Sequence, residues 1–266
     1  MGYSDESIVR DTSELTMLLA EHGLVVVPGL IRDSDSFIEF VQQLGSVVTS
    51  PFLSEVVTGT GITRLEHSTS EGELRASGGI VFESGWHNDA TFLEEPPAIS
   101  ILWCENAPEV GGDTVFCDAS FAMTSFSDQF LGFLRTLHGV HSSGGSFSTS
   151  GAYGVNQVFG ATPRWKDETG LQAVHPAIVT SPFSGDECVY LNPSYTQRLQ
   201  ELTHLESAQI LELVFRTLFM DEHLVRLTWH DRMMVIWDNS RIAHRAVNQG
   251  VVGTRRMLHC NIRMAA

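Results

Sequence analysis

The pattern of apolar and polar positions divides the chain into a few amphipathic helices and many short strands. In four segments, apolar residues recur at intervals of three and four, which predicts helices that bury one face. These stripes are Leu15, Leu18, Leu19 and His22; Phe37, Phe40, Val41 and Leu44; Phe130, Phe133, Leu134 and Leu137; and Leu211, Val214, Phe215 and Leu218. Gly23, Gly45 and Gly139 are expected to end the first three helices. Asp33 or Ser34 and a capping-box pattern at residues 203–206 are expected to begin the second and fourth.

Short apolar runs predict strands at residues 24–27, 98–103, 114–117, 173–180, 188–191, 224–229, 233–237 and 256–264. Two segments without periodicity separate them. Residues 51–85 are rich in Ser, Thr, Gly and Glu, which indicates loops and an edge strand around the mouth of a site. Residues 141–170 are interpreted as a lid or substrate loop, with a disordered surface insertion as the alternative. Many short strands with helices outside them predict one mainly β domain over residues 1–266, a sandwich or barrel flanked by helices.

Composition limits the partners that the chain is expected to have. Thirty-two acidic and 16 basic residues among 266 give a net charge of −16, which disfavours nucleic acid and anionic membrane surfaces. The four cysteines are scattered, so neither a disulfide framework nor a structural zinc site is indicated. The N-terminus lacks the features of a secretory signal, and no run of about 18 apolar residues occurs. We therefore expect a cytoplasmic protein with a small-molecule partner; its oligomeric state stays open, a homo-oligomer included.

Metal-binding chemistry is first indicated by the sequence Trp86-His87-Asn88-Asp89. On a strand, residues i and i+2 face the same side, so His87 and Asp89 would point into one cavity. An isolated pair of this kind is more often part of a core, but His244 offers a third ligand. Two imidazoles and one carboxylate form the facial triad that leaves positions on Fe(II) open for a co-substrate and oxygen. Arg256 suits the far carboxylate of 2-oxoglutarate, because a guanidinium binds carboxylates in a bidentate manner.

Together these motifs resemble the taurine dioxygenase (TauD/TfdA) family of Fe(II)/2-oxoglutarate-dependent dioxygenases over nearly the whole chain. The matching segments are residues 24–45, 86–92, 96–98, 111–114, 175–176, 190–192, 236–239 and 255–259. The resemblance implies a double-stranded β-helix, the jelly roll of clavaminate synthase-like proteins. It also implies that Fe(II) is held by His87, Asp89 and His244, which are the catalytic residues, and that 2-oxoglutarate contacts Thr114 and Arg256, with O2 as the other co-substrate. Because neighbours on a strand face opposite sides, we expect Arg255 to face solvent.

The resemblance also implies the type of reaction and limits the substrate. Halogenases related to the family leave the carboxylate position vacant for halide, so Asp89 favours an oxygen-derived outcome, most simply hydroxylation with release of succinate and CO2. Desaturation, epoxidation and demethylation use the same iron. Sulfonate-binding members carry an Arg four residues after the 2-oxoglutarate Arg, where this chain has Cys260, so we expect a neutral or amine-bearing substrate, such as one in specialised-metabolite biosynthesis. The candidate substrate residues are Glu83, Ser50, Tyr195 and Cys260, with Tyr153 and Phe159 on position alone.

Two other classes of function are compatible with the same residues. A jelly roll can serve as a non-catalytic binder or sensor, because a fold does not establish activity. A zinc-dependent hydrolase or isomerase of cupin type would have no use for Arg256. The other histidines, which are expected to be structural or on the surface, are His22, His67, His138, His141, His175, His204, His223, His230 and His259.

Overall fold

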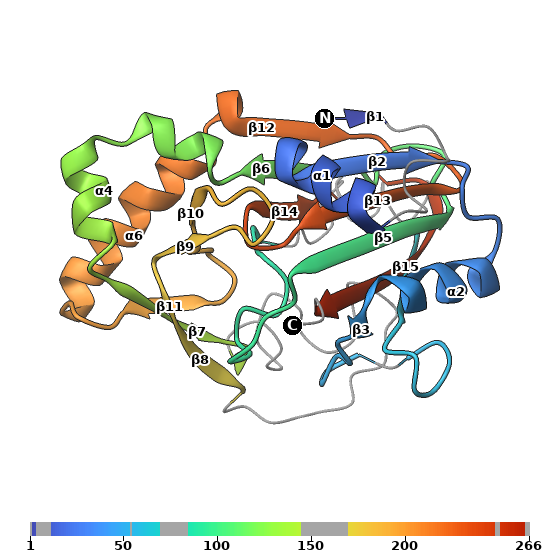
Figure 1. Ribbon diagram of the computed structural model, residues 1–266, viewed down its shortest axis with the longest axis horizontal. Coiled ribbons are helices and arrows are strands. Elements are labelled where there is room, and N and C mark those ends of the chain that lie inside the picture. Colours follow the sequence, from blue (N-terminus) through green and yellow to red (C-terminus); the bar gives the residue numbers. More distant parts are fainter. Residues whose placement is uncertain are drawn as a thin grey trace.

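Sheets that are antiparallel except for the pairing of the two first strands form the framework of the protein (Figure 1). The computed structural model describes residues 2–3, 12–53, 55–69, 85–144, 170–247 and 251–263. The largest sheet runs in the order β1 (Gly2–Tyr3), β2 (Leu24–Pro28), β13 (Met233–Asp238), β5 (Ile99–Asn106), β15 (Gly253–Arg263) and β3 (Ser46–Val47), and β4 (Thr63–Thr69) also pairs with β15. Strands from both ends of the chain therefore lie side by side at its centre.

Smaller sheets complete the framework. One has the order β12 (Leu224–Leu227), β6 (Thr114–Asp118) and β14 (Ile242–Ala246), and another has β11 (Thr196–Leu199), β7 (His138–Ser142) and β8 (Gln172–Pro176). A hairpin of β9 (Ile178–Thr180) and β10 (Glu187–Val189) lies beside them. This arrangement is a jelly roll, which confirms the predicted mainly β fold with flanking helices.

Alternation along the central strands separates two layers of core. On β13, Met234 and Ile236 pack towards the helices, whereas Val235 and Trp237 pack into the interior of the jelly roll. Successive side chains of a strand point to opposite faces, so a strand buried on both faces is apolar at nearly every position. The interior layer also contains Phe116 of β6, so it spans the space between the two sheets.

Helices cover the outside of this framework (Figure 1). The helices α1 (Thr12–His22) and α2 (Ser34–Leu44) lie on the outer face of the largest sheet, and α4 (Asp128–Leu134) and α6 (His204–Leu218) lie at the other end of the molecule, with the short 3-10 helices η2 (Phe121–Ser125) and η3 (Asp221–His223). The predicted caps are confirmed. Asp33 accepts a hydrogen bond from the Ser36 backbone N–H at 2.8 Å, and Thr203 and Glu206 form the capping box of α6.

The prediction that Gly139 ends a helix is wrong. The third helix ends at Leu134, and Gly139 lies within β7. A Cβ at Gly139 would come within 2.7 Å of Leu191 and 2.8 Å of the His141 ring, so a side chain here would force one of these neighbours to move. The run at 173–180 also divides into β8 and β9, and the residues of β7, β11 and β14 carry too little apolar pattern to have been predicted as strands.

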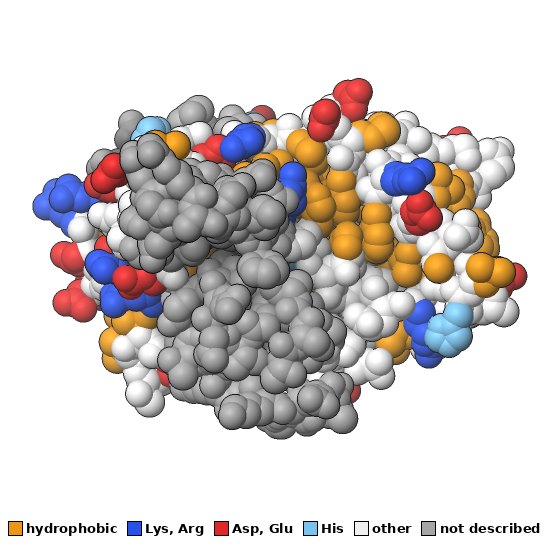
Figure 2. All heavy atoms as spheres, turned by 180° about the vertical axis from the view of Figure 1, so that it is seen from behind, with side chains coloured by type: hydrophobic (Ala, Val, Ile, Leu, Met, Phe, Trp, Pro, Cys, Tyr) orange, Lys and Arg blue, Asp and Glu red, His pale blue; other side chains and the backbone are white. Residues whose placement is uncertain are grey.

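Neither charge dominates among the coloured residues on the face shown in Figure 2. Among the coloured residues, acidic and basic side chains alternate around the edge, and apolar side chains gather between them. No helix in the described part of the chain is long and apolar enough to cross a membrane.

Candidate metal and co-substrate site

A short β-bridge holds the two candidate histidine ligands together. The His87 N–H donates to the His244 carbonyl at 3.0 Å, and the His244 N–H donates to the His87 carbonyl at 2.8 Å. His244 belongs to β14, whereas His87 lies just before a loop. The two rings are 4.2 Å apart between centroids. Backbone pairing therefore fixes the relative position of two side chains that are 157 residues apart in the sequence, the difference between 244 and 87.

Asn239 holds the loop that carries Asp89. Its side-chain oxygen accepts from the Asp89 N–H at 2.7 Å, and its amide donates to the carbonyls of Asp89 and Pro97 at 2.9 and 3.0 Å. Asn88 donates in turn to the Asn239 carbonyl at 2.9 Å. Asn239 was not among the predicted site residues, although it lies in a segment that matches the family. The available signal was only its place in a matching segment beside a predicted strand, because its burial is visible only in the structure.

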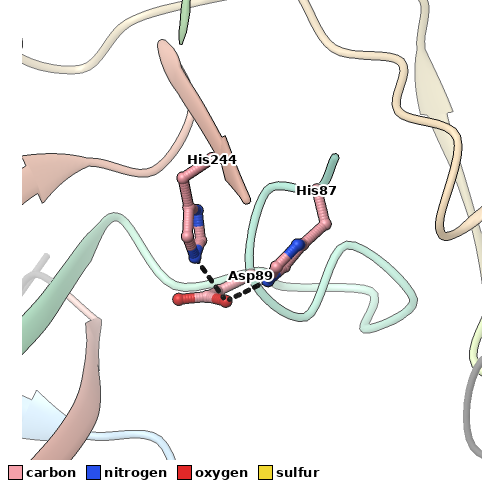
Figure 3. A group of neighbouring side chains, drawn as sticks. All are labelled: His87, Asp89 and His244. Atoms are coloured by element: carbon pink, nitrogen blue, oxygen red, sulfur yellow. Dashed lines mark ion pairs between the residues drawn. The ribbon is translucent and has the colours of Figure 1, made fainter. Parts of the chain in front are cut away.

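The three candidate ligands converge on one point, as Figure 3 shows. The Asp89 Oδ1 atom lies 3.6 Å from His87 Nε2 and 3.9 Å from His244 Nε2. Atoms that each bind one ion at about 2.0–2.2 Å lie at most roughly 4.4 Å apart, so both separations suit a shared metal. The His87 Nδ1 lies 2.9 Å from the Gly85 carbonyl, which favours a proton on Nδ1 and leaves the lone pair on Nε2. The donor set and its spacing therefore fit a divalent metal.

The protonation states also suit metal binding. Burial lowers the pKa of His244 to about 3 and lowers the pKa of His87, so both imidazoles are neutral. Burial alone would raise the pKa of Asp89, but the neighbouring His259, which hydrogen-bonds to its carboxylate, holds that pKa below its usual range. Two neutral nitrogen donors and one ionised carboxylate result.

The predicted orientation of the two adjacent arginines is wrong. Arg255 is 3% exposed and lines the cavity that contains the three candidate ligands. Arg256 lies on the opposite side of β15, where it donates to Glu66 at 3.1 Å and also lies 3.7 Å from Glu105. The interior position of Met257 explains this, because residues two apart on a strand share a face.

Arg255 is suited to bind an anion inside the cavity. Its Nη1 donates to the Gly112 carbonyl at 3.0 Å, and no carboxylate among the described residues pairs with it. Burial lowers the pKa of Arg255 to about 10, so the group stays charged at neutral pH. Thr114, which is also buried in the cavity wall, accepts a hydrogen bond from the Trp229 ring at 2.9 Å. A buried cation with no counter-charge in the described part of the chain, together with a nearby hydroxyl, fits a bound carboxylate.

The candidate substrate residues have different positions in the structure. Tyr195 lines the cavity and packs edge-on against Phe92, whose ring centroid is 5.1 Å away. Ser50 also lines the cavity, where its hydroxyl accepts from the N–H groups of Phe52 and Leu53 at 3.3 and 3.1 Å. Glu83, Tyr153, Phe159 and most of the predicted lid, residues 145–169, lie outside the described residues.

Cys260 borders the cavity, but its side chain packs with Leu258 and Ile262 in the core beneath the helices. Burial raises the pKa of this thiol. With Arg255 as the cavity arginine, the residue four positions later is His259, not Cys260. His259, which the sequence predicted to be structural or on the surface, lies beside a candidate ligand, with its Nε2 3.0 Å from Asp89 Oδ2.

Buried His141 supports the loop that carries Asp89 through contacts separate from those of Asn239. His141 is fully buried, its Nδ1 lies 2.8 Å from the Thr91 hydroxyl, and Asn192 also donates to that hydroxyl at 3.4 Å. His175 lies 2.9 Å from the Thr91 carbonyl through Nε2. These contacts fix the chain two residues after Asp89.

His141 is expected to make the protein sensitive to acid. Burial, and then the neighbouring His175, lower the pKa of His141 to about 3, whereas an unfolded histidine titrates near 6.5. Between these values the unfolded state binds a proton that the folded state does not, so the free energy of unfolding falls as the pH falls. Replacing His141 with Asn, which keeps a donor near Thr91, should reduce that slope by about 1.4 kcal/mol per pH unit. Urea unfolding from pH 7 to 4 measures the slope, and an unchanged slope would contradict the assignment.

Comparison with known proteins agrees with this geometry. The family model "Taurine catabolism dioxygenase TauD, TfdA family" matches residues 4–261. An alpha-ketoglutarate-dependent sulfonate dioxygenase of Saccharomyces cerevisiae is 30% identical over 61% of this chain, and pentalenolactone F synthase of Streptomyces avermitilis is 30% identical over 60%. A putative sulfonate dioxygenase of Schizosaccharomyces pombe is 25% identical over 92% of this chain. The chain spans 38% and 61% of the lengths of the two yeast relatives and 54% of the synthase.

Solved structures show the same fold. A taurine dioxygenase from Burkholderia xenovorans superposes with a TM-score of 0.73 at 23% identity, covering 98% of this chain and 83% of that one. A structure described as AAD-2 in complex with Mn(II) and N-oxalylglycine gives a TM-score of 0.75 at 17% identity, covering 97% and 92%. The likeness to these structures supports the fold, and the family model covers nearly all of the sequence. The chain therefore belongs to the taurine catabolism dioxygenase TauD, TfdA family.

Proposed function

We propose that the protein is an Fe(II)- and 2-oxoglutarate-dependent oxygenase that hydroxylates a C–H bond of a small, uncharged molecule. The observation that carries this proposal is the shared cavity of three convergent ligands and the buried Arg255, which has no carboxylate partner among the described residues. A non-catalytic binder would not need both a metal-ligand set and a charged anion site in one cavity. A zinc hydrolase would have no use for the charged anion site at Arg255.

Different residues of the cavity would bind the iron and 2-oxoglutarate. His87, Asp89 and His244 would hold the iron, which with 2-oxoglutarate and oxygen supplies the oxidising power to break an unactivated C–H bond, releasing succinate and CO2. Arg255 would bind the carboxylate of 2-oxoglutarate that is remote from the metal, and the Thr114 hydroxyl would donate to the same group. The apolar wall beside them would exclude water from the reacting centre.

The described wall of the cavity favours an uncharged substrate with an apolar body. Phe52, Phe92 and Tyr195 form a buried cluster beside the ligands, with ring centroids 5.3 and 5.1 Å apart. Among the described lining residues, Asp89 and Arg255 are the charged ones, and both have roles towards the metal and co-substrate. The described lining residues supply no second cation to bind a sulfonate or sulfate. They therefore do not favour the sulfonate substrate that the names of the yeast relatives would suggest.

Substrate-dependent release of succinate tests the proposal. We expect Fe(II)- and 2-oxoglutarate-dependent turnover with uncharged alcohols or amides, and little with sulfonates of the same carbon skeleton. Phe92→Ala should raise KM about tenfold, because a packed aromatic contact is lost. Phe121→Ala is the matched control, since Phe121 is 55% exposed and outside the cavity. Turnover of the sulfonates alone would contradict the proposed substrate class, and no 2-oxoglutarate-dependent turnover with any member of the panel would contradict the oxygenase.

A further inference from the structure

His259 contacts a candidate metal ligand from the interior face of β15. Its Nε2 lies 3.0 Å from Asp89 Oδ2, and its side chain is 14% exposed beside an Asp89 side chain that is 9% exposed. An ionised carboxylate only accepts hydrogen bonds, so the nitrogen that faces it carries the proton. His259 therefore donates a charge-assisted hydrogen bond inside a largely buried site.

The two oxygens of Asp89 have separate neighbours. Oδ1 faces His87 Nε2 and His244 Nε2 at 3.6 and 3.9 Å, whereas Oδ2 faces His259. Figure 3 shows both dashed lines meeting at one oxygen while the other points away from the histidine pair. The carboxylate thus presents one oxygen to the point where the three ligands converge.

We propose that His259 is a positioning residue that holds Asp89 Oδ2 and so leaves Oδ1 as the single oxygen for the metal. The proposal rests on the proposed function, because it assigns a metal to His87, Asp89 and His244. A carboxylate that turned about its bond to Cβ could bind through both oxygens and occupy a position that the co-substrate needs. Asn239 fixes the backbone of Asp89, and His259 fixes the end of its side chain.

The geometry of β15 explains how His259 reaches the candidate metal ligand Asp89. Arg255 and His259 are four residues apart on the same face of β15, a distance of about 13 Å along a strand. The strand therefore directs a guanidinium towards the proposed 2-oxoglutarate end of the cavity and an imidazole towards the metal end. His259 acts through Asp89 and not on the substrate, so its effect should be seen in metal binding itself.

Three substitutions of His259 separate positioning from packing. Gln places its amide nitrogen near the position of Nε2, Asn is too short to reach Oδ2, and Leu has no donor. Mn(II) affinity, measured by calorimetry without substrate, should stay within about threefold for His259→Gln. It should fall by about 10- to 100-fold for His259→Asn and His259→Leu. Exposed His230 provides the control, because His230→Leu should leave the affinity unchanged.

A second measurement uses the visible absorption of bound Co(II), which depends on the number of ligand atoms. The spectrum should match the parent in His259→Gln and change in His259→Leu, because the released carboxylate can rotate. Equal Mn(II) affinity in the parent and His259→Leu, or a loss in His259→Gln as large as in His259→Leu, would overturn the role of His259. Absence of Mn(II) binding in the parent would instead overturn the proposed function. Thermal unfolding of the metal-free variants shows whether the fold is retained, and His259→Gln keeps the proposal testable if His259→Leu unfolds.

Discussion

Replacing Arg255 with alanine is expected to weaken the binding of 2-oxoglutarate to the Mn(II)-loaded protein by about 100- to 4,000-fold. The reason is that Arg255 is 3% exposed, so its charge and that of a bound carboxylate are both removed from water. Losing one partner of such a buried pair costs about 3–5 kcal/mol, which corresponds to this loss of affinity. Arg255→Lys keeps the charge without the bidentate geometry, so its affinity for 2-oxoglutarate should lie between those of the parent protein and Arg255→Ala.

Arg256→Ala is the matched control on the neighbouring position. Arg256 is about one-third exposed and pairs with Glu66 on the outer side of β15, so its loss should change the affinity for 2-oxoglutarate by less than about threefold. Isothermal titration with 2-oxoglutarate measures both variants. A larger loss in Arg256→Ala than in Arg255→Ala would show that the strand presents the other arginine to the co-substrate, as the sequence alone had suggested.

The arginine pair shows where sequence reasoning reaches its limit. Alternation on a strand states that Arg255 and Arg256 face opposite sides, but not which of them faces inwards. That choice depends on the pairing of β15 with β5, where the register shifts between Arg256 and Met257. The same choice decides whether His259 or Cys260 faces the candidate ligands. One undetermined choice of face therefore led the sequence prediction to Arg256 instead of Arg255 and to Cys260 instead of His259.

Local features were predictable because their causes are local. The stripe of Phe37, Phe40 and Val41 and the cap at Asp33 depend on residues within one helix, and α2 begins and ends as predicted. The candidate ligands could also be found, since His87 and Asp89 are two residues apart and His244 completed a known donor set. Their convergence within 4.8 Å agrees with that prediction, although the metal itself stays a proposal.

Contacts between distant segments were beyond the reach of the sequence. Asn239 and Asp89 are 150 residues apart, and His141 and Thr91 are 50 apart. Asparagine and histidine in such positions carry no periodic signal that distinguishes a buried support from a surface residue. The candidate ligands could therefore be found from the sequence, whereas the groups that hold their loop could be found only from the structure.

Asn239 is expected to contribute more to stability than any other single amide at the site. Asn239→Ala would leave the Asp89 N–H and the carbonyls of Asp89 and Pro97 without their present partner in a fully buried region. Each of these three buried groups costs about 1–3 kcal/mol when it loses its partner, and the three losses do not add fully because they share one side chain, so the free energy of unfolding should fall by about 3–6 kcal/mol. Urea unfolding of the metal-free protein measures this change.

Asn261 provides the comparison for that substitution. Its side chain accepts one hydrogen bond, from Ser100 at 2.7 Å, and it lies on the same strand as Arg255. Asn261→Ala should therefore cost about 1 kcal/mol and retain Mn(II) binding. Asn239→Ala should also lower Mn(II) affinity, because the backbone of Asp89 loses the two hydrogen bonds that hold it opposite the histidine pair. If Asn239→Ala were no less stable than Asn261→Ala, the loop would be held by its packing against Phe52 and Tyr195 rather than by the amide.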